Sequence, residues 1–276
     1  MRHMQRRAFI AITGGAALFL ANAGLAVPPA GAEEIAAFYR ASYAGLPAGE
    51  VRFHFAGDGA GYRYEIGVET EGLPRLVTHF RGTAEGEGRL AADGRAAPLR
   101  YDALYDLRQR RDSRISMRFV GRAGDVIAER EAADTSRKPP LADLYRRNVV
   151  DPIAAMAAIR RGLWVQLPAP AQDFTVPVYD GARRFDVLVH VVSAGAKAGE
   201  KNDVIRLLLT LQPIAGFRSE SSEDGDPGDA PRAMEAVFSD DANLVPLSMR
   251  VTVWYLPMVV TFDHFCKDFA SCGAGP

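Results

Sequence analysis

The stretch "VVDPIAAMAAIRRGLW", residues 149–164, is the one long helical pattern in a chain whose other regular segments alternate like β-strands. Asp151 is a favourable N-cap, and Pro152 occupies the first helical position, where its missing N–H costs nothing. Apolar residues recur at helical spacing. They are Ile153, Met156, Ile159 and Leu163. Gly162 is expected to end the helix, so the pattern predicts one central helix at about residues 151–162.

Period-two alternation of apolar and polar residues lies on both sides of this helix, which is typical of strands with one dry and one wet face. The alternating segments are 51–55, 62–68, 99–105 and 114–119 before the helix, and 174–178, 183–192, 203–211 and 247–265 after it. Asp-Gly pairs at Asp58, Asp93 and Asp180 fit the tight turns of β-hairpins.

These patterns predict a mainly β fold: a strongly curved antiparallel sheet, or a partly open barrel, wrapped around one central α-helix. Alanines flank the apolar stripe of the helix and would allow the sheet to approach it closely. No Pro/Gly-rich linker separates the two halves, so residues 33–276 are expected to form a single domain. The polar stretch at about 218–232 is expected to be a mobile acidic loop. Its acidic spacing lacks the closing glutamate of an EF-hand, so no calcium site is predicted there.

The N-terminus predicts a cleavable export signal at residues 1–32, with Arg2, Arg6 and Arg7 first, an apolar stretch next and small residues at Ala30 and Ala32. The paired arginines also fit a twin-arginine signal, and the general secretory route stays open. The apolar stretch is interrupted by polar residues, whereas a permanent anchor needs about 20 apolar ones. The expected location is therefore the periplasm, and the cleaved chain is not expected to be an integral membrane protein.

Composition excludes some partners. The 276 residues carry a formal net charge of −1 and are 48% hydrophobic, which is ordinary for a globular protein. Removal of the basic signal would make the chain more acidic. Because nucleic-acid binding depends on cationic side chains, no nucleic-acid partner is expected.

The two cysteines, Cys266 and Cys272, lie close together near the C-terminus. In an oxidising compartment this spacing predicts a disulfide that closes a short loop. A metal site that includes His264 is the alternative, but two thiols and one imidazole fall short of the four ligands of a structural zinc site. The sequence therefore predicts a disulfide, no metal and no cofactor.

No catalytic residues are predicted. The chain contains no G-x-S-x-G, H-E-x-x-H or C-x-x-C motif and no phosphate-binding loop. Asp263 and His264 are adjacent in a predicted strand, so their side chains are expected to point to opposite faces. Arginines recur on the polar faces of strands, and the favoured interpretation is a solvated face of mixed charge rather than an anion-binding patch. They are Arg52, Arg63, Arg114, Arg118, Arg184 and Arg250.

Four stretches in order, "YRASYAGLPAGEVRF", "DPIAAMAAIRRG", "VPVYDGARRFDVLV" and "FSDDANLVPLSMRVTVW", resemble the exported bacterial family known as domain of unknown function 3108. The resemblance extends from about Tyr39 to Phe262. It implies a cell-envelope location and a mostly β structure. It implies no reaction and no catalytic residues.

A curved sheet around a helix would enclose an apolar interior, suited to an acyl chain or another apolar envelope molecule. The candidate lining residues are Phe53, Phe55, Tyr64, Ile66, Met117, Phe119, Met156, Val253 and Tyr255. If the helix fills the interior, these residues are only core. The favoured function is a non-enzymatic periplasmic module that binds or transports an apolar or lipid-like ligand. The alternatives are a structural or assembly factor that binds another envelope protein, or a hydrolase with an unrecognised site.

Overall fold

The computed structural model describes the chain from Glu33 to Cys272 with short gaps, all within one compact unit, Gly31–Pro276. The described ranges are 33–58, 60–71, 80–90, 96–107, 110–122, 125–135, 139–166, 173–195, 203–217, 232–241, 243–253 and 255–272. The predicted export signal lies outside them. So does the predicted acidic loop, except that Arg232 begins a strand.

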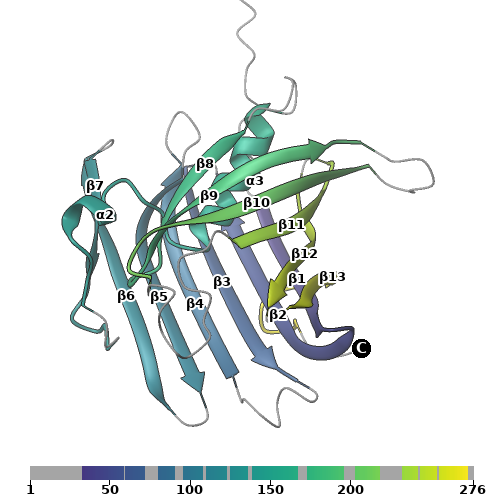
Figure 1. The fold of residues 1–276 in the computed structure, drawn as a ribbon, viewed down its shortest axis with the longest axis horizontal. Helices are drawn as coiled ribbons and strands as arrows, with labels where there is room; N and C mark the ends of the chain where they lie inside the picture. The colour runs from purple at the N-terminus through teal and green to yellow at the C-terminus, as the bar shows by residue number, and fades with distance from the viewer. Residues whose placement is uncertain are drawn as a thin grey trace, which may run out of the picture. The chain divides into compact units, whose positions relative to one another are not determined.

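Within these ranges, thirteen strands form one antiparallel sheet that curves into a nearly closed barrel (Figure 1), which confirms the predicted mainly β class. The strands are β1 (Glu33–Tyr43), β2 (Leu46–Gly57), β3 (Gly61–Thr70), β4 (Phe80–Leu90), β5 (Ala96–Leu107), β6 (Arg110–Arg122), β7 (Asp125–Arg130), β8 (Phe174–Tyr179), β9 (Arg184–Ser193), β10 (Val204–Ala215), β11 (Arg232–Ser239), β12 (Pro246–Val253) and β13 (Leu256–Phe265). Their spatial order is β7-β6-β5-β4-β3-β2-β1-β13-β12-β11-β10-β9-β8. The sheet is thus two meanders, β1–β7 and β8–β13, joined where β1 pairs with β13.

A four-residue segment, Arg147–Val150, connects the two edge strands of this sheet, and we call it the strap. Arg147 bridges to Ile127 of β7, and Val150 bridges to Val178 of β8. Main-chain hydrogen bonds of 2.7 to 2.9 Å hold the strap to both edges. Since unpaired strand edges invite association with other chains, the strap gives each edge a partner within the molecule.

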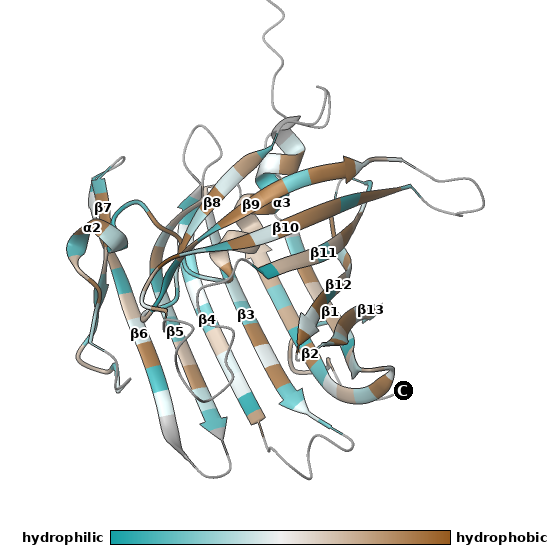
Figure 2. Ribbon diagram, viewed as in Figure 1, coloured by the Kyte–Doolittle hydropathy of each residue, from teal (hydrophilic) through white to brown (hydrophobic). Residues whose placement is uncertain are grey.

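Glycines on β4 make room for tyrosines of the neighbouring strands on the inner face of the sheet. Gly86 lies opposite Tyr64 on β3 and Tyr101 on β5, and Gly88 lies opposite Tyr62. A Cβ atom added at Gly86 would lie 2.2 Å from the Tyr64 hydroxyl oxygen, and one added at Gly88 would lie 2.4 Å from the Tyr62 ring. The tyrosine rings therefore fill the space that side chains of β4 would otherwise occupy. Figure 2 shows the alternation of hydrophobic and hydrophilic residues along these strands.

The predicted helix is α3 (Ala154–Gln166), and the Asp151 carboxylate caps its first turn. Asp151 Oδ1 accepts hydrogen bonds from the main-chain N–H groups of Ile153 at 3.0 Å and Ala154 at 2.8 Å. The buried side chains of Ile159 and Leu163 belong to the main hydrophobic core, together with residues from both meanders.

Gly162 does not end the helix as predicted, because α3 continues to Gln166. Its φ is not positive, as a terminating glycine would require. Instead, a Cβ atom at Gly162 would lie 2.5 Å from the Phe174 ring on β8. Gly162 allows helix and strand to pack closely.

The prediction of one central helix wrapped by the sheet is not confirmed. The described residues contain a second helix, α2 (Asp143–Arg146), next to β7. Helix α3 contacts strands of both meanders, through Gly162 with Phe174 of β8 and through Arg160 with Phe55 of β2. Neither described helix is long and apolar enough to span a membrane.

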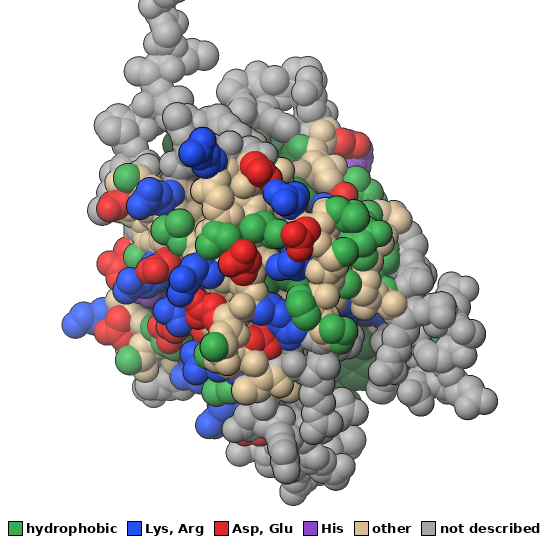
Figure 3. Space-filling view, turned by 90° about the vertical axis from the view of Figure 1, so that its left-hand side faces the viewer, with side chains coloured by type: hydrophobic (Ala, Val, Ile, Leu, Met, Phe, Trp, Pro, Cys, Tyr) green, Lys and Arg blue, Asp and Glu red, His purple; other side chains and the backbone are tan. Residues whose placement is uncertain are grey.

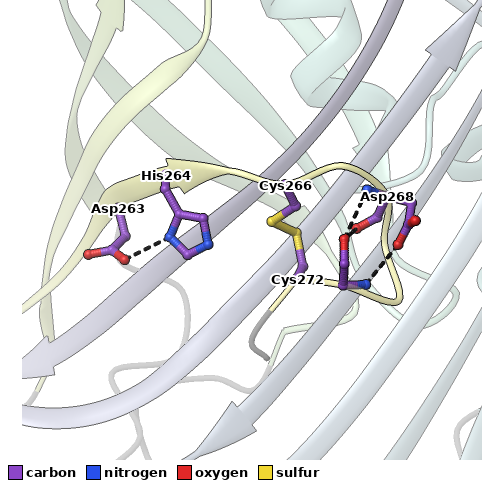
Figure 4. Close-up of a disulfide and its surroundings, with 6 residues drawn as sticks. Asp263, His264, Cys266, Asp268 and Cys272 are labelled. Atoms are coloured by element: carbon purple, nitrogen blue, oxygen red, sulfur yellow. Dashed lines mark hydrogen bonds and ion pairs between the residues drawn. A yellow bond between two sulfur atoms is a disulfide. The ribbon is translucent and has the colours of Figure 1, made fainter. Parts of the chain in front are cut away.

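The predicted disulfide between Cys266 and Cys272 is confirmed, with the two Cα atoms 5.3 Å apart (Figure 4). It closes a loop that covers the outer face of β1, where Cys272 is buried in a small cluster with Ala36 and Phe38. The inner face of the same strand is also buried, through Tyr39 among others. Strand β1 is therefore covered on both faces.

Replacing both cysteines, Cys266→Ala with Cys272→Ala, should lower the free energy of unfolding by about 2 kcal/mol, because the unfolded chain regains the entropy of the closed loop. Urea unfolding of the variant and of the oxidised parent measures the difference. Parent protein reduced with dithiothreitol serves as the control and should lose a similar amount. An unchanged urea midpoint in both samples would contradict the stabilising role of the disulfide.

Candidate functional site

An apolar cavity of about 200 Å³ lies beside the first turn of α3, on the inner face of the sheet. Its lining residues are Tyr39, Val51, Phe53, Ile66, Pro152, Ile153, Met156, Pro246, Ser248, Met249 and Val260. Of these side chains only Tyr39 and Ser248 carry a polar atom. The volume is of the same order as an engineered apolar cavity of about 150 Å³ that binds benzene.

The strand register explains why these side chains meet. Three cross-strand pairs form much of the wall: Tyr39 with Val51, Phe53 with Ile66, and Met249 with Val260. The first two pairs come from β1–β3, and the third comes from β12 and β13. The cavity therefore lies where the two meanders join, and the start of α3 covers it.

Three of the nine predicted lining residues do line this cavity: Phe53, Ile66 and Met156. Four others are buried in the main core and do not reach it. They are Phe55, Tyr64, Met117 and Phe119. For these four, the structure supports the alternative interpretation that they are only core.

Val253 and Tyr255 do not line the cavity, which corrects the prediction for both. The sequence pattern treats residues 247–265 as one strand, but the chain turns between β12 and β13. Val253 is the last residue of β12. Tyr255 lies in the turn, has a φ of 69° and is 98% exposed. Because Tyr255 lies in this turn, the alternation of inward and outward side chains does not extend to it.

The sequence did not identify eight of the lining residues: Tyr39, Val51, Pro152, Ile153, Pro246, Ser248, Met249 and Val260. For three of them, Val51, Ile153 and Met249, the signal was present, because each belongs to a predicted apolar stripe. Tyr39 gave no such signal. It lies on β1, where every residue from Ile35 to Tyr39 is buried and no alternation appears.

Asp151 forms a buried polar centre next to the cavity residue Pro152. Its side chain has no exposed surface, and the Tyr64 hydroxyl donates a hydrogen bond to Oδ1. Neither Asp151 Oδ2 nor the buried Tyr62 hydroxyl has a hydrogen-bond partner among the described residues. Burial raises the pKa of Asp151 to about 6, although the Ala154 N–H, the Tyr64 hydroxyl and the Ile153 N–H favour the ionised form.

The raised pKa of Asp151 predicts a pH dependence of stability. The folded chain binds the proton of the Asp151 carboxyl more tightly than the unfolded chain does. Protonated Asp151 therefore stabilises the fold below about pH 4, and this contribution is lost as the pH rises through about 6. Asp151→Asn keeps a good N-cap but cannot ionise. Between pH 4 and pH 7 the variant should therefore gain stability relative to the parent, by roughly 3 kcal/mol at most.

Urea unfolding of parent and variant at intervals across that pH range measures this difference. Other acids titrate in both proteins, so only the difference between the two curves reports on Asp151. A difference that does not change with pH would show that Asp151 is not protonated in the folded state over this range.

Arginines on the outer face of the sheet pair with acidic side chains. Ion pairs join Arg63 with Glu87 at 3.3 Å, Arg114 with Asp102 at 3.1 Å, and Arg118 with Glu131 at 2.9 Å. Figure 3 shows basic and acidic side chains intermixed on one side of the molecule. These contacts favour the interpretation as a solvated face of mixed charge.

The side chains of Asp263 and His264 do not point to opposite faces as predicted. His264 Nδ1 and Asp263 Oδ2 lie 2.9 Å apart (Figure 4). The cause is a β-bulge: Phe38 and Tyr39 pair with His264 and Phe262, which leaves Asp263 as the extra residue. Asp263 also pairs with Arg40 at 3.1 Å, so the carboxylate of Asp263 contacts both Arg40 and His264 at the surface.

Within the described ranges, no three histidine, cysteine or acidic side chains are grouped so that they could hold a metal ion.

Comparison with known proteins agrees with the resemblance found in the sequence. The model of a family of proteins of unknown function, DUF3108, matches residues 39–261. No curated protein matches the chain. Among solved structures, the chain is similar to a β-barrel-like protein of the domain of unknown function DUF1849 from Brucella abortus. That match has a TM-score of 0.52 and 14% sequence identity, and it covers 84% of this chain and 96% of the other. At this identity the likeness concerns the fold alone.

Proposed function

The chain belongs to the DUF3108 family, and we propose that it is a non-enzymatic module that binds or transports an apolar or lipid-like ligand. The observation that carries the proposal is the apolar cavity beside α3. In this proposal the sheet wraps around α3, which fills part of the interior and leaves the cavity at its first turn.

The exposure of the lining residues distinguishes this cavity from the core. Among the eleven described residues that line it, only Tyr39 is buried, and the other ten keep part of their surface accessible. In contrast, Phe55, Tyr64, Met117 and Phe119 are all buried. Apolar surface in contact with water costs about 25 cal/mol per Å², so a ligand that covers it gains binding energy.

The volume limits the size of the bound group. A cavity of this order holds a six-carbon ring or a short stretch of alkyl chain. Burial of about six methylenes contributes roughly 5 kcal/mol before the costs of association. A longer chain would extend from the cavity or displace the flexible Met156 side chain.

Filling the cavity should remove binding. Val51→Phe adds a ring to the cavity wall, and we expect it to weaken the binding of n-octanol at least about tenfold. Val68→Phe is the matched control, because Val68 pairs with Val51 across β2 and β3 but does not line the cavity. Ligand-observed NMR titration gives the affinities, and thermal melts verify that both variants fold.

Two results would count against the proposal. One is the absence of n-octanol binding to the parent chain, and the other is equal binding by parent, Val51→Phe and Val68→Phe. Native mass spectrometry of protein purified from its own host adds a second readout. A co-purified lipid mass that is lost in Val51→Phe supports the proposal.

A role in binding another envelope protein through a sheet edge has less support. Both edge strands, β7 and β8, form main-chain hydrogen bonds with the strap. Strand addition at either edge would have to displace these bonds.

We also propose that the protein acts in the periplasm after cleavage of residues 1–32, on the basis of the basic start, apolar stretch and small residues of the N-terminus. N-terminal sequencing of the protein from its host should give a start close to Glu33. Arg6→Lys with Arg7→Lys should accumulate precursor if the twin-arginine route operates and should be tolerated by the general secretory route. A mature protein that begins at Met1 would rule out cleavage.

A further inference from the structure

We propose that two neighbouring turns of the sheet dock the protein on a lipid surface, where an apolar ligand passes between the membrane and the cavity. We call the exposed apolar side chains of these turns the lip. They are Leu46, which follows the β1–β2 turn, and Tyr255 and Leu256 of the β12–β13 turn. The docking of the lip depends on the exposure of these side chains, and the passage of a ligand rests on the proposed function.

Hydrogen bonds hold the two turns side by side. The main-chain N–H of Ala44, in the β1–β2 turn, donates to the carbonyl of Pro257 at 2.9 Å. The Tyr43 hydroxyl donates to the main-chain carbonyl of Val253 at 3.1 Å. The lip residues therefore come from opposite ends of the described chain but form one surface at one end of the sheet.

The lip is apolar surface that this chain leaves uncovered. Tyr255 is 98% exposed, Leu46 is 53% exposed and Leu256 is 43% exposed. The backbone of Tyr255 has a φ of 69°, a conformation for which hairpin turns favour asparagine or glycine. A large aromatic side chain thus projects into solvent at a position where a small polar residue would suit the backbone better.

Apolar side chains on the inner face of the sheet connect the lip to the cavity. Met249 and Val260 line the cavity and pair across β12 and β13. Because cross-strand partners and residues two positions apart share a face, the next inward-facing row lies two residues nearer the turns. The register sets this row as Val251, Met258, Tyr43 and Leu46, across β12, β13, β1 and β2. All four are partly or largely exposed and none is charged, so the route from the lip to the cavity is apolar.

The size of the lip favours a lipid surface over a protein partner. A specific protein interface covers about 800 Å² on each partner. Three side chains at the ends of two turns do not provide such an area. Tyrosine and leucine at a turn instead suit the boundary between lipid headgroups and acyl chains, where the ring is buried and the phenol hydroxyl stays hydrated.

The charges near the lip favour apolar docking. Glu50 and Arg250 lie on the outer face of β2 and β12, next to the inward-facing Val51 and Val251, and carry opposite charges. With both signs present, attraction to anionic headgroups is not expected to dominate. The suitable probe is therefore a vesicle of zwitterionic phosphatidylcholine.

The test is flotation of the chain without its proposed export signal, residues 33–276, with these vesicles at several lipid concentrations. The parent should float at low and at high salt, because an apolar contact is little affected by screening. Tyr255→Asn with Leu256→Thr, the lip variant, should lower the partition coefficient at least about tenfold. Asparagine tolerates the positive φ at position 255, so thermal melts should show that the lip variant is as stable as the parent.

Leu188→Thr with Val192→Thr is the matched control. Both residues lie on β9, which two strands separate from β12, and they are 41% and 57% exposed. This variant should float like the parent. An equal loss of flotation in the lip variant and the control would overturn the inference, as would a parent that does not float. A concentration-dependent dimer of the parent that the lip variant abolishes, without flotation, would replace the lipid surface by a second copy of the chain.

This inference and the proposed function fail in different ways. The lip variant should keep the parent's affinity for n-octanol, and Val51→Phe should keep the parent's affinity for vesicles. If the parent binds n-octanol but not vesicles, the cavity function stands and the docking of the lip is wrong. If the parent binds vesicles but not n-octanol, the proposed function is wrong, and the passage of a ligand is wrong with it, while the docking of the lip stands.

Discussion

The pairing of β1 with β13 is the interaction on which the rest of the structure depends. It joins residues 37–43 to residues 258–265, so the first and last strands of the described chain become neighbours. Without it, the two meanders would be separate sheets with two more open edges, and their inner faces would not share one core. The burial of β1 on both faces fits this position. Its inner residues pack beside the cavity, and its outer residues pack under the disulfide loop. Closing so long a segment costs chain entropy, which the packing of β1 on both faces must offset.

The sequence predicted the strands that have one dry and one wet face and did not predict those that lack this contrast. Strands β2, β3, β5 and β6 alternate clearly and were recognised. In β1, residues on both faces are buried, so the pattern disappears. In β4 the inner positions are mostly glycines whose space belongs to Tyr62 and Tyr64 of β3. A strand whose inner surface is supplied by its neighbours leaves no apolar signal in its own sequence. Gly162 in α3 is a similar case. A side chain there would collide with the Phe174 ring of β8, a strand that the helical pattern itself does not reveal.

The alternation along each strand predicted which side chains point inward. It did not predict which of these side chains line the cavity and which are packed in the core. Phe53 and Phe55 are equivalent in the pattern, yet Phe53 lines the cavity and Phe55 is buried core beneath Arg160. The difference arises from what lies opposite each residue, which depends on the β1–β13 junction and the placement of α3. A candidate site of this kind is therefore only partly encoded in local pattern.

Asp151 connects the closure of the barrel to the wall of the cavity. The residue before it, Val150, belongs to the strap that bonds to β8, and the residue after it, Pro152, lines the cavity. Its carboxylate holds the first turn of α3 and accepts a hydrogen bond from Tyr64 on β3. One buried carboxyl thus joins the first turn of α3 to β3, directly after the strap. A charged group in such a place is costly, since burial opposes ionisation. That cost is offset because three donors converge on Oδ1, and no apolar residue of similar size could cap α3 and hold Tyr64 together.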